Sequence, residues 1–228
     1  MKIGILQSGH LPEEFLGPLG DYAQMIHRML GNRDYEYVTW NVVDGVFPDS
    51  VDDADGWLVT GSKHGAYEDL PWIPKLEDLI RDINKAGSPL VGICFGHQVI
   101  AKALGGKVIK FPEGWALGLQ DYDFEGKTLP LNAWHQDQVV ERPEGARVVA
   151  SNDFCENAAL AYGDHIFTVQ AHPEFEAEAI EGLIEFRGSV IDDKSLLEQA
   201  TNNLSKKAAN DVLAEKIANV FDKARTNE

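Results

Sequence analysis

With 228 residues and a hydrophobic fraction of 44%, the chain is long enough to bury the core of one large α/β domain or of two small ones. Its formal net charge is −17, from 37 acidic and 20 basic side chains. Because binding to nucleic acid or to anionic membranes requires basic patches, this balance argues against both as partners.

Cysteine content and hydropathy indicate the compartment. The two cysteines, Cys94 and Cys155, are too few for a disulfide framework, which a chain of this length does not need. The apolar stretch at the N-terminus is too short for a signal peptide, and no apolar run approaches the roughly 18 residues of a membrane span. We therefore expect a protein of the reducing cytoplasm.

The first half of the chain alternates predicted strands with predicted helices. Apolar and β-branched runs predict strands at residues 2–6, 35–42, 57–60 and 89–93. Apolar side chains at helical spacing predict helices at residues 21–30, 72–86 and 96–104. This alternation is typical of a parallel sheet with helices on both faces, which binds ligands at the carboxyl ends of its strands.

The pattern changes after residue 107. Short β-like pieces predict a small antiparallel extension, at residues 117–124, 139–140, 147–150, 158–162 and 166–170. A helix follows at residues 176–187, and the pattern stays helical over residues 191–224. We interpret residues 1–190 as one α/β domain and residues 191–228 as a helical C-terminal extension packed on the same domain.

One cysteine lies between two glycines where the fourth strand is expected to turn into a helix. Residues 92–98 read Gly-Ile-Cys-Phe-Gly-His-Gln, directly after an apolar run. This is the layout of a nucleophile elbow, with sulfur in place of the serine oxygen. The glycines leave room for a sharp turn, and the N-terminus of the following helix favours a thiolate. The elbow predicts Cys94 as a nucleophile; a buried structural cysteine is the alternative.

A thiolate nucleophile needs a base, and the base needs a group that orients it. His172 follows a predicted strand, and Pro173 disfavours helix at that position. In an extended segment residues two apart share a face, so Glu174 is expected to turn its carboxylate toward His172. The sequence thus predicts a Cys94–His172–Glu174 relay, although a histidine near a glutamate is more often a surface pair.

These two motifs together resemble the class I glutamine amidotransferase domain, a family with a G-x-C-x-G-x-Q elbow and a downstream H-P-E. The similarity covers nearly all of the chain to about residue 187. It implies a flavodoxin-like three-layer α/β sandwich. It also implies hydrolysis of a γ-glutamyl amide through a γ-glutamyl thioester on Cys94, with the ammonia often passed to a synthetase. The expected partners are then glutamine or a γ-glutamyl small molecule and, if one exists, a synthetase on a separate chain.

The same resemblance implies roles for further residues. The oxyanion hole would use the N–H groups of Phe95 and of Ser62, which stands in a Thr-Gly-Ser-Lys stretch where the family has S-G-G-P. Gly61 belongs to this loop and is expected to contact the substrate, and Gln98 matches the family position that helps to hold the glutamyl group. His135 lies in a segment similar to the family's H-x-D motif, where a satisfied structural histidine is the alternative.

The sequence does not identify the substrate. The Thr-Gly-Ser-Lys loop and the residues that follow it, together residues 60–68, are similar to stand-alone γ-glutamyl peptidases, which cleave γ-glutamyl bonds in peptides. A non-catalytic DJ-1-like stress or binding protein is a third possibility, against which the H-P-E segment argues. We expect no cofactor. We also expect no metal, because His64, His97 and His135 match no zinc spacing. Cys155 is expected to be structural.

Overall fold

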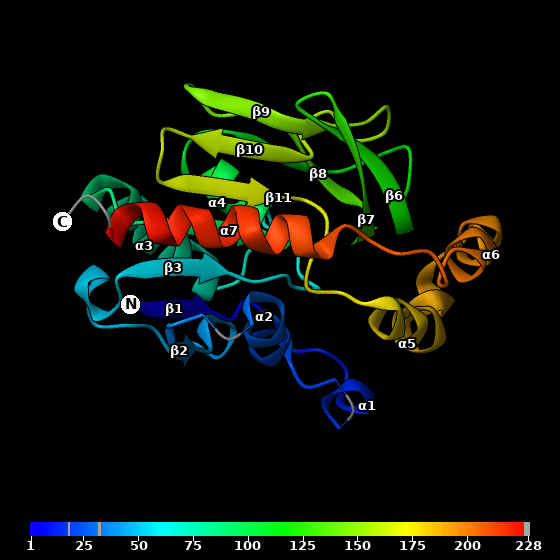
Figure 1. Cartoon of the computed structure of the whole chain (residues 1–228), viewed down its shortest axis with the longest axis horizontal. Helices are drawn as coiled ribbons and strands as arrows, with labels where there is room; N and C mark the ends of the chain where they lie inside the picture. Colours follow the sequence, from blue (N-terminus) through cyan, green and yellow to red (C-terminus); the bar gives the residue numbers. More distant parts are fainter. Residues whose placement is uncertain (18, 32, 226–228) are drawn as a thin grey trace.

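A computed structural model describes residues 1–17, 19–31 and 33–225, and these contain a nine-stranded central sheet (Figure 1). The strands of that sheet are β1 (Lys2–Leu6), β2 (Glu36–Trp40), β3 (Gly56–Val59), β4 (Leu90–Ile93), β6 (Ala116–Phe124), β7 (Lys127–His135), β9 (Ala146–Ser151), β10 (Ala159–Tyr162) and β11 (Ile166–Val169). Their order across the sheet is β2-β1-β3-β4-β11-β10-β9-β6-β7.

The strands from β2 to β11 in that order run parallel, and those from β11 to β7 pair antiparallel. The parallel strands β1, β3, β4 and β11 are buried on both faces, which explains their continuous apolar sequences. Strand β11 pairs with β4 so that Val169 lies opposite Ile93. The chain segments that follow these two strands, which carry the cysteine elbow and the H-P-E motif, therefore begin side by side.

Helices cover both faces of the sheet, as expected for a three-layer sandwich. Helices α2 (Tyr22–Leu30) and α7 (Asn210–Arg225) share one apolar cluster with the sheet, and α7 crosses that face in Figure 1. Helices α3 (Trp72–Ala86) and α4 (Phe95–Ala103) pack in the other cluster. A two-stranded sheet, β5 (Lys107–Lys110) with β8 (Asp137–Glu141), completes that second layer.

The remaining elements lie at one end of the molecule, near the carboxyl ends of the parallel strands (Figure 1). They are α1 (Glu13–Leu16), α5 (Ala177–Arg187) and α6 (Lys194–Asn202). Short 3₁₀ turns occupy residues 42–44, 51–53 and 188–190. Within the described ranges, no helix is both long enough and apolar enough to cross a membrane.

The structure departs from the sequence predictions in the second half of the chain. The sequence pattern does not predict strand β7, because Pro130 interrupts it; β7 is an edge strand, where proline is tolerated. The four-residue strand β5 is also absent from the prediction. The helical pattern over residues 191–224 consists of two helices, because α6 ends at Asn202 and α7 begins at Asn210.

The C-terminal helices pack against the rest of the fold. In α7, Leu213, Ile217 and Phe221 have no exposed surface and belong to the same cluster as Ile3 and Val91. Helix α6 packs its Ala200 against β6. The boundary between residues 190 and 191 stays a prediction, and residues 226–228 of the expected extension lie outside the described residues.

Two glycines allow α4 to approach the sheet closely. A Cβ atom on Gly96 would lie 2.2 Å from the Val59 carbonyl oxygen, and one on Gly92 would lie 2.6 Å from the Gly96 carbonyl carbon. Neither contact can be relieved by moving a side chain, because both involve backbone atoms. The turn between β4 and α4 therefore requires glycine at both positions.

We expect Gly96→Ala to lower the free energy of unfolding by about 1–3 kcal/mol or more, because overpacking usually costs that much. The matched control is Gly17→Ala, because Gly17 has no atom within 4 Å of its added Cβ and its φ is −67°. Urea denaturation of both variants tests this, and equal stabilities of the two would contradict the close approach of α4 to β3.

Candidate active site

Cys94 occupies a strained position at the start of α4. Its φ is 53° and its ψ is −104°, a conformation that residues other than glycine rarely adopt. Its N–H donates to the Val169 carbonyl at 2.9 Å, which joins the end of β4 to the end of β11. The residue is 5% exposed and lines a cavity. Strain at a cleft residue is typical of functional sites.

His172 and Glu174 form a buried pair. The distance between His172 Nδ1 and Glu174 Oε1 is 2.7 Å, and both side chains are almost completely buried. The segment is not extended as predicted, because the Phe175 N–H donates to the His172 carbonyl at 3.1 Å and closes a turn. Pro173 takes the second position of this turn, which its fixed φ favours. The turn, rather than a shared strand face, brings the carboxylate to the imidazole.

The surroundings of His172 keep its ring protonated. Burial alone would lower the pKa of the imidazole, but the Glu174 carboxylate and the Cys94 sulfur raise it to about 10. Because Glu174 takes Nδ1, Nε2 is the ring nitrogen available to Cys94. The Phe175 ring stacks on the imidazole with 4.0 Å between centroids and parallel planes, which fixes the ring orientation.

The two expected oxyanion donors lie in suitable backbone positions. Phe95 is the first residue of α4, where N–H groups have no partner within the helix. Cys94 and Glu125 are the residues other than glycine that have positive φ in the described chain, so Ser62 has an ordinary φ that suits its Cβ. Neither the Ser62 N–H nor the Phe95 N–H donates to another group in the part of the chain that the structure describes.

Gln98 and His135 both contact the Asp137 carbonyl. Gln98 Nε2 donates to that oxygen at 3.0 Å and to Gln170 Oε1 at 3.1 Å, so both of its amide hydrogens are used. His135 Nδ1 lies 3.2 Å from the same oxygen. Burial lowers the pKa of His135 to about 3, so Nδ1 donates and the buried Nε2 is a bare acceptor. Of the polar atoms in these two side chains, Gln98 Oε1 and His135 Nε2 have no hydrogen-bond partner among the described residues and remain for a substrate.

These residues open into a cavity of about 500 Å³. Its volume falls in the usual range of about 300–1,000 Å³ for small-molecule sites. Cys94, His172, Ser62, Gln98 and His135 line it, together with the aromatic side chains of Tyr22, Tyr67, Trp115, Trp134 and Phe175. Three exposed cations also line it, Lys63, Lys110 and Arg187. The arrangement can hold a small molecule with both apolar and anionic parts.

Sequence reasoning misses Tyr22 as a residue of this site, because its place in the helical stripe of residues 21–30 identifies it only as a core residue. Its ring lies against Gly61, where an added Cβ would come within 3.1 Å of Tyr22 and 3.0 Å of His172. Burial raises the pKa of the Tyr22 hydroxyl, and the nearby Cys94 and Glu174 add to this effect. The hydroxyl is therefore a neutral hydrogen-bond donor at the cavity wall.

The other polar candidates lie outside this arrangement. His97 is fully buried with Nδ1 at 2.8 Å from the Thr168 hydroxyl. Cys155 is buried in the core, and burial raises the pKa of its thiol to about 12. Among the described residues, no group of three or more His, Cys, Asp or Glu side chains is placed to hold a metal ion.

A family model described as glutamine amidotransferase class-I matches residues 19–189, which include the elbow and the H-P-E turn. The chain belongs to the class I glutamine amidotransferase family. The strained cysteine and the buried His172–Glu174 pair lie within the matched domain, whereas helices α6 and α7 lie beyond its end.

Curated relatives of this chain carry different names. A glutamine amidotransferase-like protein of Schizosaccharomyces pombe is 31% identical over 93% of this chain and 95% of its own length. Gamma-glutamyl peptidase 3 of Arabidopsis thaliana is 31% identical over 73% of this chain and 74% of its own. One subunit of the glutamine-hydrolysing GMP synthase of Halobacterium salinarum is 30% identical over 71% of this chain and 90% of its own.

A solved structure supports the fold. The crystal structure of a glutamine amidotransferase from Methylobacillus flagellatus superimposes with a TM-score of 0.72 at 20% sequence identity. The match covers 98% of this chain and 94% of that one. The predicted three-layer α/β sandwich with a mostly parallel central sheet is therefore confirmed.

Glu174→Gln is expected to lower the pKa of His172 by about 1–3 pH units, because the charge that raises it is lost while burial, which lowers it, remains. NMR titration of the His172 ring measures this, with the half-buried His165, at the opposite end of β11, as an internal reference. An unchanged His172 pKa would show that the carboxylate does not control the imidazole.

Proposed function

We propose that this amidotransferase hydrolyses γ-glutamyl amides through a thioester on Cys94. The observation that carries the proposal is the shared cavity, where the strained Cys94 lies beside a buried, charged His172–Glu174 pair. The names of the relatives, glutamine amidotransferase and gamma-glutamyl peptidase, support this chemistry.

In the first step, the Cys94 sulfur attacks the γ-carbonyl carbon of the substrate. As the tetrahedral intermediate collapses, the C–N bond breaks and His172 transfers its Nε2 proton to the leaving nitrogen. Ammonia or an amine leaves, and the γ-glutamyl group stays on sulfur. Glu174 stabilises the imidazolium that supplies the proton, since its carboxylate lies 2.7 Å from Nδ1.

In the second step, water attacks the thioester carbon. His172, now neutral, takes a proton from this water, the C–S bond breaks and glutamate leaves. The sulfur regains its negative charge and His172 its proton, so the site returns to its starting state. In both steps the Ser62 and Phe95 N–H groups stabilise the oxyanion; loss of one such donor costs about 2.7–4 kcal/mol in barrier height.

The cavity favours a substrate larger than glutamine. Lys63, Lys110 and Arg187 line the cavity of a chain with a net charge of −17, beside the carboxyl groups of Glu68 and Asp137, and Trp115 and Trp134 add apolar surface. A γ-glutamyl peptide would present a carboxylate on its leaving group to these cations. A γ-glutamyl peptidase activity is therefore the second candidate function.

A separate synthetase chain remains a candidate partner. The similarity to a subunit of a GMP synthase favours an arrangement in which the ammonia passes to such a chain. Glutamate release that requires addition of a synthetase would indicate this arrangement, whereas release by the isolated chain indicates a stand-alone hydrolase. The site proposed here serves either case, in the cytoplasm.

Cys94→Ala is expected to reduce kcat/KM for glutamate release by roughly 10⁴-fold or more, because it removes the nucleophile. The assay is free glutamate from glutamine and from a set of γ-glutamyl peptides. Cys155→Ala is the matched control and should retain activity, because Cys155 lies in the core outside the cavity. Unchanged turnover in Cys94→Ala would contradict the mechanism. A wild type inactive on every substrate, alone or with an added synthetase, would favour a binding protein.

Replacing one cation separates the two substrate classes. Lys63→Gln or Arg187→Gln should raise KM for a γ-glutamyl peptide about two- to fivefold, the effect of losing one exposed ion pair, and leave KM for glutamine nearly unchanged. Lys85→Gln, on α3 outside the cavity, is the control. Equal effects on both substrates would argue against recognition of an anionic leaving group.

A further inference from the structure

The carbonyl oxygen of Phe175 accepts two buried side-chain amides. Asn132 Nδ2, from β7, donates to it at 2.9 Å, and Asn210 Nδ2, from the first residue of α7, donates at 3.0 Å. Both asparagines are more than nine-tenths buried. A backbone carbonyl has two lone pairs, so this oxygen is fully satisfied by side chains alone.

Phe175 closes the turn that holds the His172–Glu174 pair. Its N–H bonds to the His172 carbonyl, and its ring stacks in parallel on the imidazole. The His172 N–H, in turn, donates to the Asn132 backbone carbonyl at 2.8 Å. Asn132 in β7 therefore fixes both ends of the turn. Asn210, at the start of α7, also fixes its C-terminal end.

Asn210 is held in place independently of the turn. Behind it, Leu213 and Ile217 of α7 have no exposed surface. Just before it, the Ala209 N–H donates to the Pro130 carbonyl of β7 at 2.7 Å. Figure 1 shows that α7 begins at the end of the sheet where β3 and β11 finish. The amide is thus presented to the turn by a helix fixed in the core.

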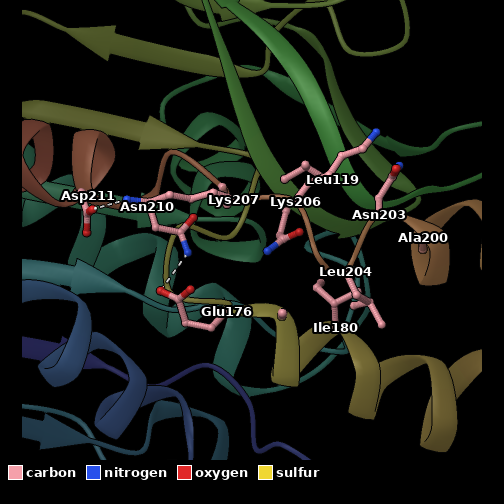
Figure 2. Close-up of a pocket in the computed structure, with 13 residues that line it drawn as sticks. Leu119, Glu176, Ile180, Ala200, Asn203, Leu204, Lys206, Lys207, Asn210 and Asp211 are labelled. Carbon is pink, nitrogen blue, oxygen red and sulfur yellow. Dashed lines mark hydrogen bonds and ion pairs between the residues drawn. The ribbon is translucent and has the colours of Figure 1, made fainter.

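The second amide hydrogen of Asn210 reaches the start of α5. Asn210 Nδ2 lies 3.2 Å from Glu176 Oε1, and Figure 2 shows this contact at the side of a small cavity of about 90 Å³. Glu176 is the N-cap residue of α5. One side chain therefore joins the start of α7, the end of the H-P-E turn and the start of α5.

We propose that Asn210 is a positioning residue for the amidotransferase reaction, through which the C-terminal helix α7 holds the His172–Glu174 turn in its working geometry. Asn210 lies outside residues 19–189, the part of the chain that matches the family model. The proposal rests on the proposed function for its kinetic consequence, but the placement of His172 can be measured without turnover. Asn210 touches no reacting atom; it acts on His172 through Phe175.

The test compares Asn210→Asp with Asn210→Ala. Aspartate keeps the size of asparagine and suits the first turn of a helix, so α7 is expected to form, but an oxygen replaces the donor that faces the Phe175 carbonyl. We expect kcat on the best γ-glutamyl substrate to fall about 10- to 100-fold with little change in KM, because a catalytic group displaced by about 1 Å costs up to that much. The NMR pKa of His172 should fall in the same variants, because its contact with Glu174 loosens.

The matched control is Asn203→Ala. Asn203 lines the same small cavity, and Figure 2 shows it on the side away from Glu176. Its side chain makes none of the hydrogen bonds to the turn, so its kcat and His172 pKa should stay at the wild-type values.

The outcomes separate the two proposals. Folded Asn210 variants with wild-type kcat and an unchanged His172 pKa would overturn the positioning role while leaving the proposed function intact. A wild-type protein that releases no glutamate, alone or with an added synthetase, would overturn the proposed function, and the His172 pKa in the Asn210 variants would still decide the positioning role. If Asn210→Asp does not fold, because its buried carboxylate would face Glu176 Oε1, Asn210→Ala alone gives the same two measurements.

Discussion

The site depends on the close contact between the first turn of α4 and the end of β3. Without a Cβ, a glycine Cα in a helix can lie directly against a backbone carbonyl of a strand. Gly96 faces the Val59 carbonyl oxygen in this way. That approach forces the chain to turn sharply after Ile93, and Cys94 takes the strained φ of 53° as a result. The strain is held by the hydrogen bond from Cys94 to Val169 and by the buried surroundings of α4. A looser junction would let the cysteine relax to ordinary backbone angles and turn its sulfur elsewhere.

The second requirement is a buried charged pair whose partners are close in sequence. A carboxylate and an imidazolium removed from water are costly unless they contact each other, and the turn at Pro173 makes that contact local. Glu174 still has one oxygen, Oε2, buried without a hydrogen bond among the described residues. His172 is therefore the hydrogen-bond partner that the described residues give this carboxyl group.

Much of this arrangement is predictable from short motifs. The G-x-C-x-G spacing indicates the tight turn, because each glycine stands where a Cβ would meet backbone atoms. The pairing of β4 with β11 is not readable from the sequence, although the order of motifs after strands implies a common sheet edge. The pattern at residues 172–175 predicts extended backbone, but the structure has a turn there. Pro173 restricts His172 in the same way in an extended segment and in a turn, and only the hydrogen bond from the Phe175 N–H to His172 distinguishes the two. Tyr22 and Asn210 cannot be assigned by pattern, because their roles depend on contacts with residues far away in sequence.

The sheet order also bears on how the chain reaches this fold. Strand β11 lies between β4 and β10 in the sheet. The pairing of β4 with β11, which brings Cys94 near His172, therefore forms only after the chain from β5 to β10 has closed into a long loop. Closing so long a loop carries an entropic cost before any contact compensates for it. Non-local parallel pairing of this kind is slow to form. Cys94 is therefore expected to stay apart from His172 until late in folding, so an incompletely folded chain carries a thiol without the imidazole that the proposed function pairs with it.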